Sequence, residues 1–245
     1  MNTEGNKQSV NVLSYNIHHG VGEDGKLDLA RIAGVIKQAG AEIIALQEVD
    51  KHWSERSQYA DQAQTLAELL DMHCVFAANL DRAPAEGRTQ RRQYGLALLS
   101  KYPIAASSHH ALPKLEEDSE QRGLLQATIQ VGAATVHVYS VHLALSVEER
   151  LLQNQKIVEI AQGQSGSHIF MGDFNAGPKT TEMKPMFEHY AEAFQGREDA
   201  YTFPVTQPSI QGDYIFFSKN MEAVRSEIID TIASDHLPPT AVLQF

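Results

Sequence analysis

Short apolar runs that favour β-strands alternate along the chain with amphipathic stretches that favour helices. The predicted strands are residues 10–17, 42–49, 94–100, 123–131, 134–145, 168–173, 213–218 and 239–245. The predicted helices are residues 27–40, 61–72 and 146–162, with a short helical stretch near 180–190. Strands outnumber helices, and a short Gly-Ala turn joins two of the strands as in a hairpin. This pattern predicts sheets packed together and covered outside by helices.

Two of the predicted helices carry recognisable end signals. The stretch 27–40 places its apolar residues on one helical face and stops at Gly40, a residue type that favours helix ends. The stretch 146–162 begins with Ser146 and has Glu149 three residues later. This is the capping-box arrangement that satisfies the free amides at a helix start.

Length and composition indicate one domain. The chain has 245 residues, of which 42% are apolar, and it shows neither a short-period repeat nor a linker. We therefore expect a tail over residues 1–9 and a single domain over residues 10–245. No apolar run reaches the length of a membrane span, and the N-terminus lacks the features of a signal peptide. The single cysteine, Cys74, suits a reducing compartment. We expect a cytoplasmic protein and assume a monomer, although a chain whose signal peptide had been removed would look the same.

The charge balance is acidic. Twenty Lys and Arg against 31 Asp and Glu give a formal net charge of −11, which disfavours tight, sequence-independent binding to duplex nucleic acid. One dense basic segment, residues 81–92, contains Arg82, Arg88, Arg91 and Arg92. This segment is either a solvated loop or a loop that faces phosphate. A nucleic-acid partner therefore stays open but is not favoured.

Polar side chains recur at the ends of the predicted strands. They are Asn16, Glu48, His142, Asp173, Asn175, Asp213, Asp235 and His236. Each has an ordinary explanation when taken alone: Asp and Asn favour turns, and a strand-end Glu can form a boundary salt bridge. Together they predict one sheet edge that gathers oxygen ligands and imidazoles, a set that suits a hard divalent cation and phosphate.

The order of six short motifs resembles that of a known family. "LSYNI", "QE", "HL", "GDFN", "DYIF" and "SDH" match the pattern of the endonuclease/exonuclease/phosphatase superfamily, the DNase I-like metal-dependent phosphoesterases, from about residue 10 to 245. "YGLALLSKYPI" and "TFP" resemble stretches of its small bacterial members. The resemblance implies a four-layer α/β/β/α sandwich of two mixed sheets, with the site at one edge.

The resemblance also implies roles for the strand-end residues. Glu48 is the expected principal metal ligand, with Asn16 beside it and Asp235 at the edge of the metal site. The expected ion is Mg²⁺, with Mn²⁺ as a substitute, since Mg²⁺ takes only one or two carboxylates and keeps several waters.

The remaining residues are expected to act on the ester and the water. His236 is the expected acid/base imidazole, with Asp213 holding its tautomer. Asp173 is expected to orient or deprotonate the attacking water. The expected phosphate contacts are Asn175, His142 and Arg122. An ion pair of Arg122 with one of the nearby acids would explain it as well, and these acids are Glu116, Glu117, Asp118 and Glu120.

One departure from the family pattern concerns the residues before "DYIF". Many members have an arginine and an apolar residue there, whereas this chain has Gln211 and Gly212. The departure puts any contact of that arginine in doubt.

The sequence predicts a divalent-metal-dependent hydrolase of phosphate esters, and we expect a phosphodiesterase. A nuclease is the alternative, while a sphingomyelinase-like lipid phosphodiesterase or a scaffold without catalysis is less favoured.

Overall fold

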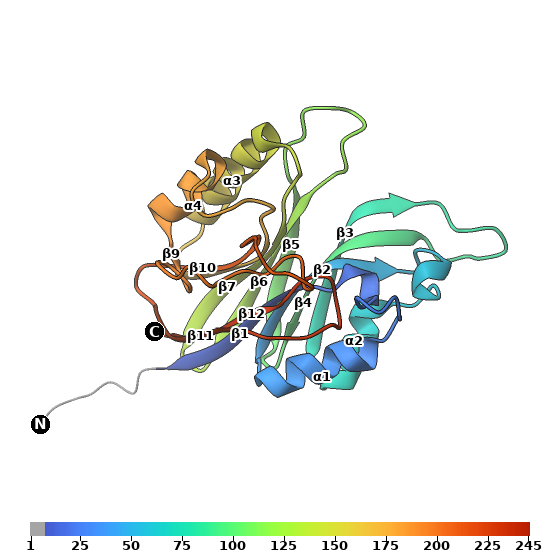
Figure 1. Cartoon of the computed structure of the whole chain (residues 1–245), viewed down its shortest axis with the longest axis horizontal. Helices are drawn as coiled ribbons and strands as arrows, with labels where there is room; N and C mark the ends of the chain where they lie inside the picture. The colour runs from blue at the N-terminus through green and yellow to red at the C-terminus, as the bar shows by residue number, and fades with distance from the viewer. Residues whose placement is uncertain (1–7) are drawn as a thin grey trace, which may run out of the picture.

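Two mixed six-stranded sheets pack face to face in the computed structural model, which describes residues 8–245 (Figure 1). The first sheet has the strand order β11 (Glu222–Ile228), β12 (Pro239–Gln244), β1 (Ser9–Asn16), β2 (Ile43–Lys51), β4 (Arg92–Ser100) and β3 (His73–Arg82). The second has the order β5 (Ile104–Ala111), β6 (Gly123–Val131), β7 (Ala134–His142), β8 (Ser167–Asp173), β10 (Asp213–Phe217) and β9 (Ala191–Glu192). The pairs β1–β2 and β7–β8 are parallel, and the other neighbours are antiparallel.

Helices cover the outer faces of both sheets. They are α1 (Leu29–Ala39), α2 (Gln62–Leu70), α3 (Val147–Gln162) and α4 (Lys184–His189), with 3-10 turns at η1 (His18–Gly20), η2 (Glu55–Ser57) and η3 (Thr181–Met183). In Figure 1, α1 and α2 lie against one sheet and α3 and α4 against the other. The predicted α/β/β/α sandwich is therefore confirmed. Within residues 8–245, none of the helices is long and apolar enough to cross a membrane.

Central strands bury both of their faces. Val12 and Ile43 point into the core between the sheets, whereas their neighbours Leu13 and Ile44 pack under α1 and α2. A strand that is buried on both sides becomes an almost continuous apolar run, which is why these strands are evident in the sequence.

Some elements differ from the sequence prediction. Four strands were not predicted, and they are β3, β5, β9 and β11. The first strand begins at Ser9, inside the predicted tail, and Gln8 forms backbone hydrogen bonds with Phe245. Residues 1–7 of that tail lie outside the described residues.

The capping box of α3 is only half formed. The Ser146 hydroxyl accepts a hydrogen bond from the Glu149 amide at 3.2 Å, as expected. The Glu149 carboxylate instead accepts from the Leu115 amide at 2.8 Å, a contact that lowers its pKa. The glutamate therefore anchors the β5–β6 connection to the start of α3.

A buried ion pair joins α3 to η3. The Arg150 guanidinium donates to Glu182 Oε1 at 2.8 and 3.2 Å, and it also donates to the carbonyls of Ala144 and Leu145. Both side chains are buried. The pair fixes the segment that follows His142 at the end of β7.

Replacing Arg150 by Met should destabilise the fold by about 3–5 kcal/mol, because Glu182 would remain as an unpaired buried charge. Urea unfolding followed by circular dichroism measures the effect. Lys156→Met on the exposed face of α3, which removes a surface pair with Glu159, should change stability by less than about 1 kcal/mol. The double variant Arg150→Met/Glu182→Leu should recover much of the loss, and equal losses in the single and double variants would contradict this account.

A second buried acid lies at the end of β9. Glu192 accepts a hydrogen bond from the Phe194 amide through Oε2 at 3.0 Å, whereas Oε1 has no hydrogen-bond partner within residues 8–245. Burial raises the pKa of this carboxyl to about 7, against the smaller lowering effects of that hydrogen bond and of Arg197.

Because Glu192 ionises at a higher pH in the folded than in the unfolded chain, its contribution to stability should fall as pH rises from about 4.5 to about 7. In Glu192→Gln this contribution is absent. The difference in unfolding free energy between variant and parent should therefore shift by roughly 3 kcal/mol in favour of the variant across that window. Urea unfolding at a series of pH values tests this, and a difference that stays constant with pH would refute it.

Candidate active site

The predicted polar residues converge because four strand ends of the second sheet lie in register. His142 pairs with Gly123 on one side and with Asp173 on the other, and Asp173 pairs with Asp213. Arg122 directly precedes Gly123, so the row runs from Arg122 to Asp213 across four strands. The first sheet adds Asn16 from the end of β1 and Glu48 from β2.

A bulge in β2 sets the position of Glu48. The pairing between β2 and β4 shifts register between Leu46 and Val49, and Glu48 itself has a positive φ of 59°. An extra residue in a strand bends it locally and redirects a side chain. Here the redirected side chain is the carboxylate predicted to bind metal.

The Asn16 amide links the two sheets at this edge. Its Nδ2 donates to Glu48 Oε1 and to Asp173 Oδ2, each at 3.1 Å, and its Oδ1 accepts from the His18 amide. One planar NH₂ group thus uses both of its hydrogens to hold together two carboxylates from different sheets.

Glu48 has the donor atoms that a divalent cation needs. Burial raises the pKa of its carboxyl, the Asn16 hydrogen bond opposes this, and the charge of Asp235 raises it further. Within residues 8–245 only Oε1 of Glu48 accepts a hydrogen bond. A half-buried carboxylate beside a second acid, with one oxygen free, fits a hard cation well. Asp235 Oδ1 lies 3.2 Å from the Ser234 hydroxyl oxygen and 3.9 Å from His18 Nδ1.

A second cluster, formed by Asp173, Asp213 and His236, also has metal-ligating atoms close together. One atom from each lies within 4.8 Å of the others, and all three residues are buried. His236 Nδ1 lies 2.8 Å from Asp213 Oδ2, and its Nε2 lies 3.8 Å from Asp173 Oδ2.

Charge within this cluster is balanced by the imidazole. Burial alone lowers the pKa of His236, but the charge of Asp213, the hydrogen bond to it and the charge of Asp173 outweigh burial and raise the pKa to about 10. Burial and the charge of Asp213 raise the pKa of Asp173 to about 7, although His236 lowers it. The raised pKa favours the protonated imidazole, whose two nitrogens face the carboxyl groups of Asp213 and Asp173.

His142 contacts Arg122. Arg122 Nη1 lies 3.0 Å from His142 Nε2 and 3.1 Å from Glu120 Oε1. Since arginine only donates, His142 Nε2 accepts. Burial and the charge of Arg122 keep the pKa of His142 well below its usual value. In this arrangement His142 has no Nε2 proton to give, which differs from the direct phosphate contact expected from the sequence. Arg122 therefore forms an ion pair with a nearby acid, Glu120, and also contacts His142 in the candidate site.

Asn175 lies in a tight turn directly after β8. Its positive φ of 52° is a conformation that asparagine tolerates, and its amide N–H donates to Asp173 Oδ1 at 2.9 Å. The side-chain Nδ2 donates to the Leu143 carbonyl at 3.0 Å, which leaves its second hydrogen available. The turn that follows β8 therefore also positions two residues of the candidate active site, Asp173 and Asn175.

Sequence reasoning assigned no role to the residues that hold the Asp213–His236 pair. The buried Thr202 hydroxyl accepts from the amides of Gly212 and Asp213 at 3.1 and 3.2 Å, and the Thr202 carbonyl accepts from the Leu237 amide. The Phe203 ring packs on His236 with centroids 4.7 Å apart. The motif "TFP", noticed only as a family resemblance, was the available signal.

A double sandwich of mixed sheets with acids, an amide and imidazoles at one edge defines the DNase I-like class of folds. A sequence profile described as "Endonuclease/Exonuclease/phosphatase family" matches residues 13–236, and the chain belongs to this family. Its members are generally hydrolases of phosphate esters.

Solved structures agree on the fold. An endonuclease/exonuclease/phosphatase from Beutenbergia cavernae has a TM-score of 0.84 at 23% identity, with 97% of this chain and 72% of that chain covered. A mannosyl-6-phosphatase from Bacteroides thetaiotaomicron has a TM-score of 0.78 at 15% identity, with 96% of this chain and 100% of that chain covered. TDP2 from C. elegans has a TM-score of 0.72 at 17% identity, with 98% of this chain and 77% of that chain covered. At these identities the likeness concerns the fold.

Gly172→Ala should disrupt the site through the backbone. A Cβ at Gly172 would lie well inside van der Waals distance of the Val141 carbonyl on the neighbouring strand, so β7 and β8 would have to separate. His142 and Asp173, which follow these two residues, would move apart. We expect a loss of at least about 2 kcal/mol in stability together with the loss of the site geometry. Urea unfolding checks the first effect, and Gly34→Ala on α1, where a Cβ meets open space, is the matched control.

Proposed function

We propose that the protein is a divalent-metal-dependent phosphodiesterase whose site is formed by Asn16, Glu48, Asp173, Asp213 and His236. The observation that carries the proposal is the bridging Asn16 amide. It holds the carboxylate of Glu48 beside that of Asp173, and Asp173 lies next to the His236–Asp213 pair. Hydrolysis of a phosphate ester needs a carboxylate that binds the cation, a carboxylate that positions the water and a positive group that stabilises the phosphate charge. The proposed site supplies all three.

Glu48 and Asn16 would hold the ion, Mg²⁺ or in its place Mn²⁺, with Asp235 at the edge of its coordination shell. Asn16 Oδ1 already accepts from the His18 amide but keeps a second lone pair for a ligand role. When bound, the ion supplies charge neutralisation for the phosphate oxygens.

The other residues act on the water and the phosphate group. Asp173 orients the attacking water and takes its proton as the water oxygen bonds to phosphorus. The bond from phosphorus to the alcohol oxygen of the ester breaks, and the departing oxygen gains a proton from solvent. His236 donates from Nε2 to a phosphate oxygen, while Asp213 fixes the ring through Nδ1. Asn175 contributes its remaining side-chain hydrogen to the phosphate.

Arg122 is the second phosphate contact in this proposal. Its Nη1 is held by His142 and Glu120, and a guanidinium has five N–H donors in all. His142 then positions Arg122, because its Nε2 accepts from the guanidinium.

Nuclease activity is the weaker alternative. The net charge of −11 repels a polyanion, and the basic residues of the 81–92 segment have partners within the chain. Arg91 pairs with Asp81 at 2.7 Å, Arg88 lies over the Tyr59 ring, and Arg82 lies over the Trp53 ring. We further propose a cytoplasmic location, because the lone Cys74 suits a reducing compartment.

The activity test is hydrolysis of bis-p-nitrophenyl phosphate, p-nitrophenyl phosphate, single-stranded and duplex DNA, RNA and sphingomyelin, with Mg²⁺, Mn²⁺ or EDTA. We expect metal-dependent cleavage of the aryl diester. Glu48→Gln and His236→Ala should each lower kcat/KM by about 10²-fold or more, because each removes one function of the site. The exposed residues Glu68 and His73 provide the matched controls Glu68→Gln and His73→Ala. Folded protein without activity on any substrate would refute the proposal.

Metal binding can be measured apart from catalysis by calorimetric titration with Mg²⁺ and by the electron paramagnetic resonance of Mn²⁺. Glu48→Gln should weaken binding by about tenfold or more, whereas Asp213→Asn should leave it within a few-fold. The opposite ranking would move the cation to the Asp173–Asp213–His236 cluster.

A further inference from the structure

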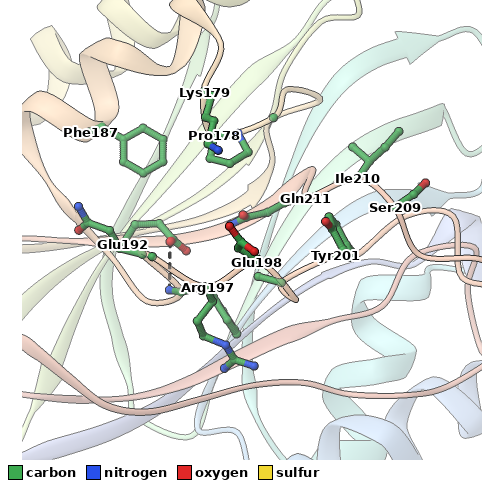
Figure 2. A pocket seen from close by; sticks show the side chains of 15 residues that line it. Pro178, Lys179, Phe187, Glu192, Arg197, Glu198, Tyr201, Ser209, Ile210 and Gln211 are labelled. Atoms are coloured by element: carbon green, nitrogen blue, oxygen red, sulfur yellow. Dashed lines mark hydrogen bonds between the residues drawn. The ribbon is translucent and has the colours of Figure 1, made fainter.

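A cavity of about 730 Å³ lies beside the candidate active site, and we name it the β9 pocket (Figure 2). Its lining includes Gly177, Phe187, Glu192, Arg197, Tyr201 and Gln211. The volume is in the range of pockets that bind small molecules.

The chain connects the β9 pocket directly to the site. Gly177 follows Asn175 by two residues, and Gln211 precedes Asp213 by two, a separation of at most about 7 Å. The Tyr214 hydroxyl lies 2.6 Å from the Ala176 carbonyl and 3.1 Å from the Gln211 carbonyl. These contacts hold the wall of the pocket against the strand that begins with Asp213.

Two buried polar groups of this pocket have no hydrogen-bond partner within residues 8–245. They are Glu192 Oε1 and Gln211 Nε2, in side chains of residues only 6% and 7% exposed. Figure 2 shows the carboxyl of Glu192 and the amide of Gln211 turned toward the same space. Buried polar atoms are normally paired, and here one can accept while the other donates. A hydroxyl group, which does both, satisfies the two together.

Charges around the pocket balance. The lining contains two basic residues, Lys179 and Arg197, and two acidic ones, Glu192 and Glu198, and Arg197 forms an ion pair with Asp199 at 2.8 Å. The lining therefore favours a neutral ligand over an anion or a cation.

Two of the three aromatic rings of the pocket contact other side chains. The Arg197 guanidinium lies over the Phe194 ring at 5.3 Å, and Phe187 packs edge-on against Phe216 with centroids 5.0 Å apart. The third ring, that of Tyr201, belongs to a residue that is 41% exposed and could stack on a flat base. The unpaired atoms of Glu192 and Gln211, and not these rings, therefore favour a hydroxylated group.

We propose that the β9 pocket binds a neutral polyhydroxylated group, a sugar or polyol, that is the alcohol part of the phosphate ester cut at the neighbouring site. Glu192 accepts a hydrogen bond from one hydroxyl, and Gln211 donates to the same or the next one. The terminal torsions of both side chains are soft, so their end groups can turn toward the ligand. The claim that the bound group is part of the substrate rests on the proposed phosphodiesterase function. The binding of a sugar or polyol does not depend on catalysis.

The test is calorimetric titration of the full chain with methyl α-glucoside, and separately with uridine, both free of phosphate. We expect the glucoside to bind and Gln211→Leu to bind it about tenfold more weakly, since one hydrogen bond is lost. Within residues 8–245 no atom forms a hydrogen bond with Gln211 Nε2, so this variant should fold normally. A thermal unfolding measurement would check this. The exposed Gln164 gives the matched control Gln164→Leu.

A second variant, Gln211→Arg, should abolish glucoside binding, because a longer cation would fill the pocket and pair with Glu192. Absence of glucoside binding in the parent chain, or equal binding in the parent and Gln211→Leu, would overturn the proposal. Binding of uridine in preference to the glucoside would overturn it as well.

Hydrolysis separates this result from the proposed function. If bis-p-nitrophenyl phosphate is cut but the glucoside does not bind, the β9 pocket proposal fails alone. If the glucoside binds as expected but no phosphate ester is cut, the pocket assignment holds and the proposed function fails. With a p-nitrophenyl diester of a hexose phosphate as substrate, methyl α-glucoside should raise KM and leave kcat unchanged.

Discussion

The site depends on keeping two acids from different sheets beside each other, one buried (Asp173) and one half-buried (Glu48). Like charges held this close repel, and removal from water penalises each of them further. The Asn16 amide meets this constraint between Glu48 and Asp173, because its two hydrogens satisfy one oxygen of each. Its own position is fixed in turn, since the Ser234 hydroxyl donates to the Asn16 carbonyl at 2.7 Å. This hydrogen bond attaches the "SDH" segment to the end of β1 and so places His236, two residues after Ser234, near Asn16.

The sequence predicted the inner strands of both sheets and none of the outer ones. The four strands that it did not reveal, β3, β5, β9 and β11, are the four edges of the two sheets. An edge strand has fewer neighbours, so exposed polar residues interrupt its apolar pattern; β5 reads "IAASSHHA" and is mostly exposed. Such strands are defined by pairing with a neighbour, and that information is absent from a local stretch of sequence.

The site was predictable as a set of residues, but its contacts were not. Strand-end polar residues and the family resemblance together pointed to Glu48, Asp173 and His236, while the bulge that turns Glu48 inward depends on how β2 pairs with β4. The contact between His142 and Arg122 likewise arises from the register of β6 and β7. Thr202 was missed because its role is to accept two backbone hydrogens, which any small polar residue in a loop resembles in sequence.

The place of β12 between β11 and β1 has a consequence for biosynthesis. Val12 in β1 pairs with Ala241 in β12, so a central ladder of the first sheet closes only after residue 241 has left the ribosome. Pairing across such a long separation is slow, because the ends of a long loop must first meet. Asp235 and His236 immediately precede that strand. Until this strand pairs, the nascent chain carries the first sheet in an open, incomplete state, and its acid–imidazole site forms among the last events of folding.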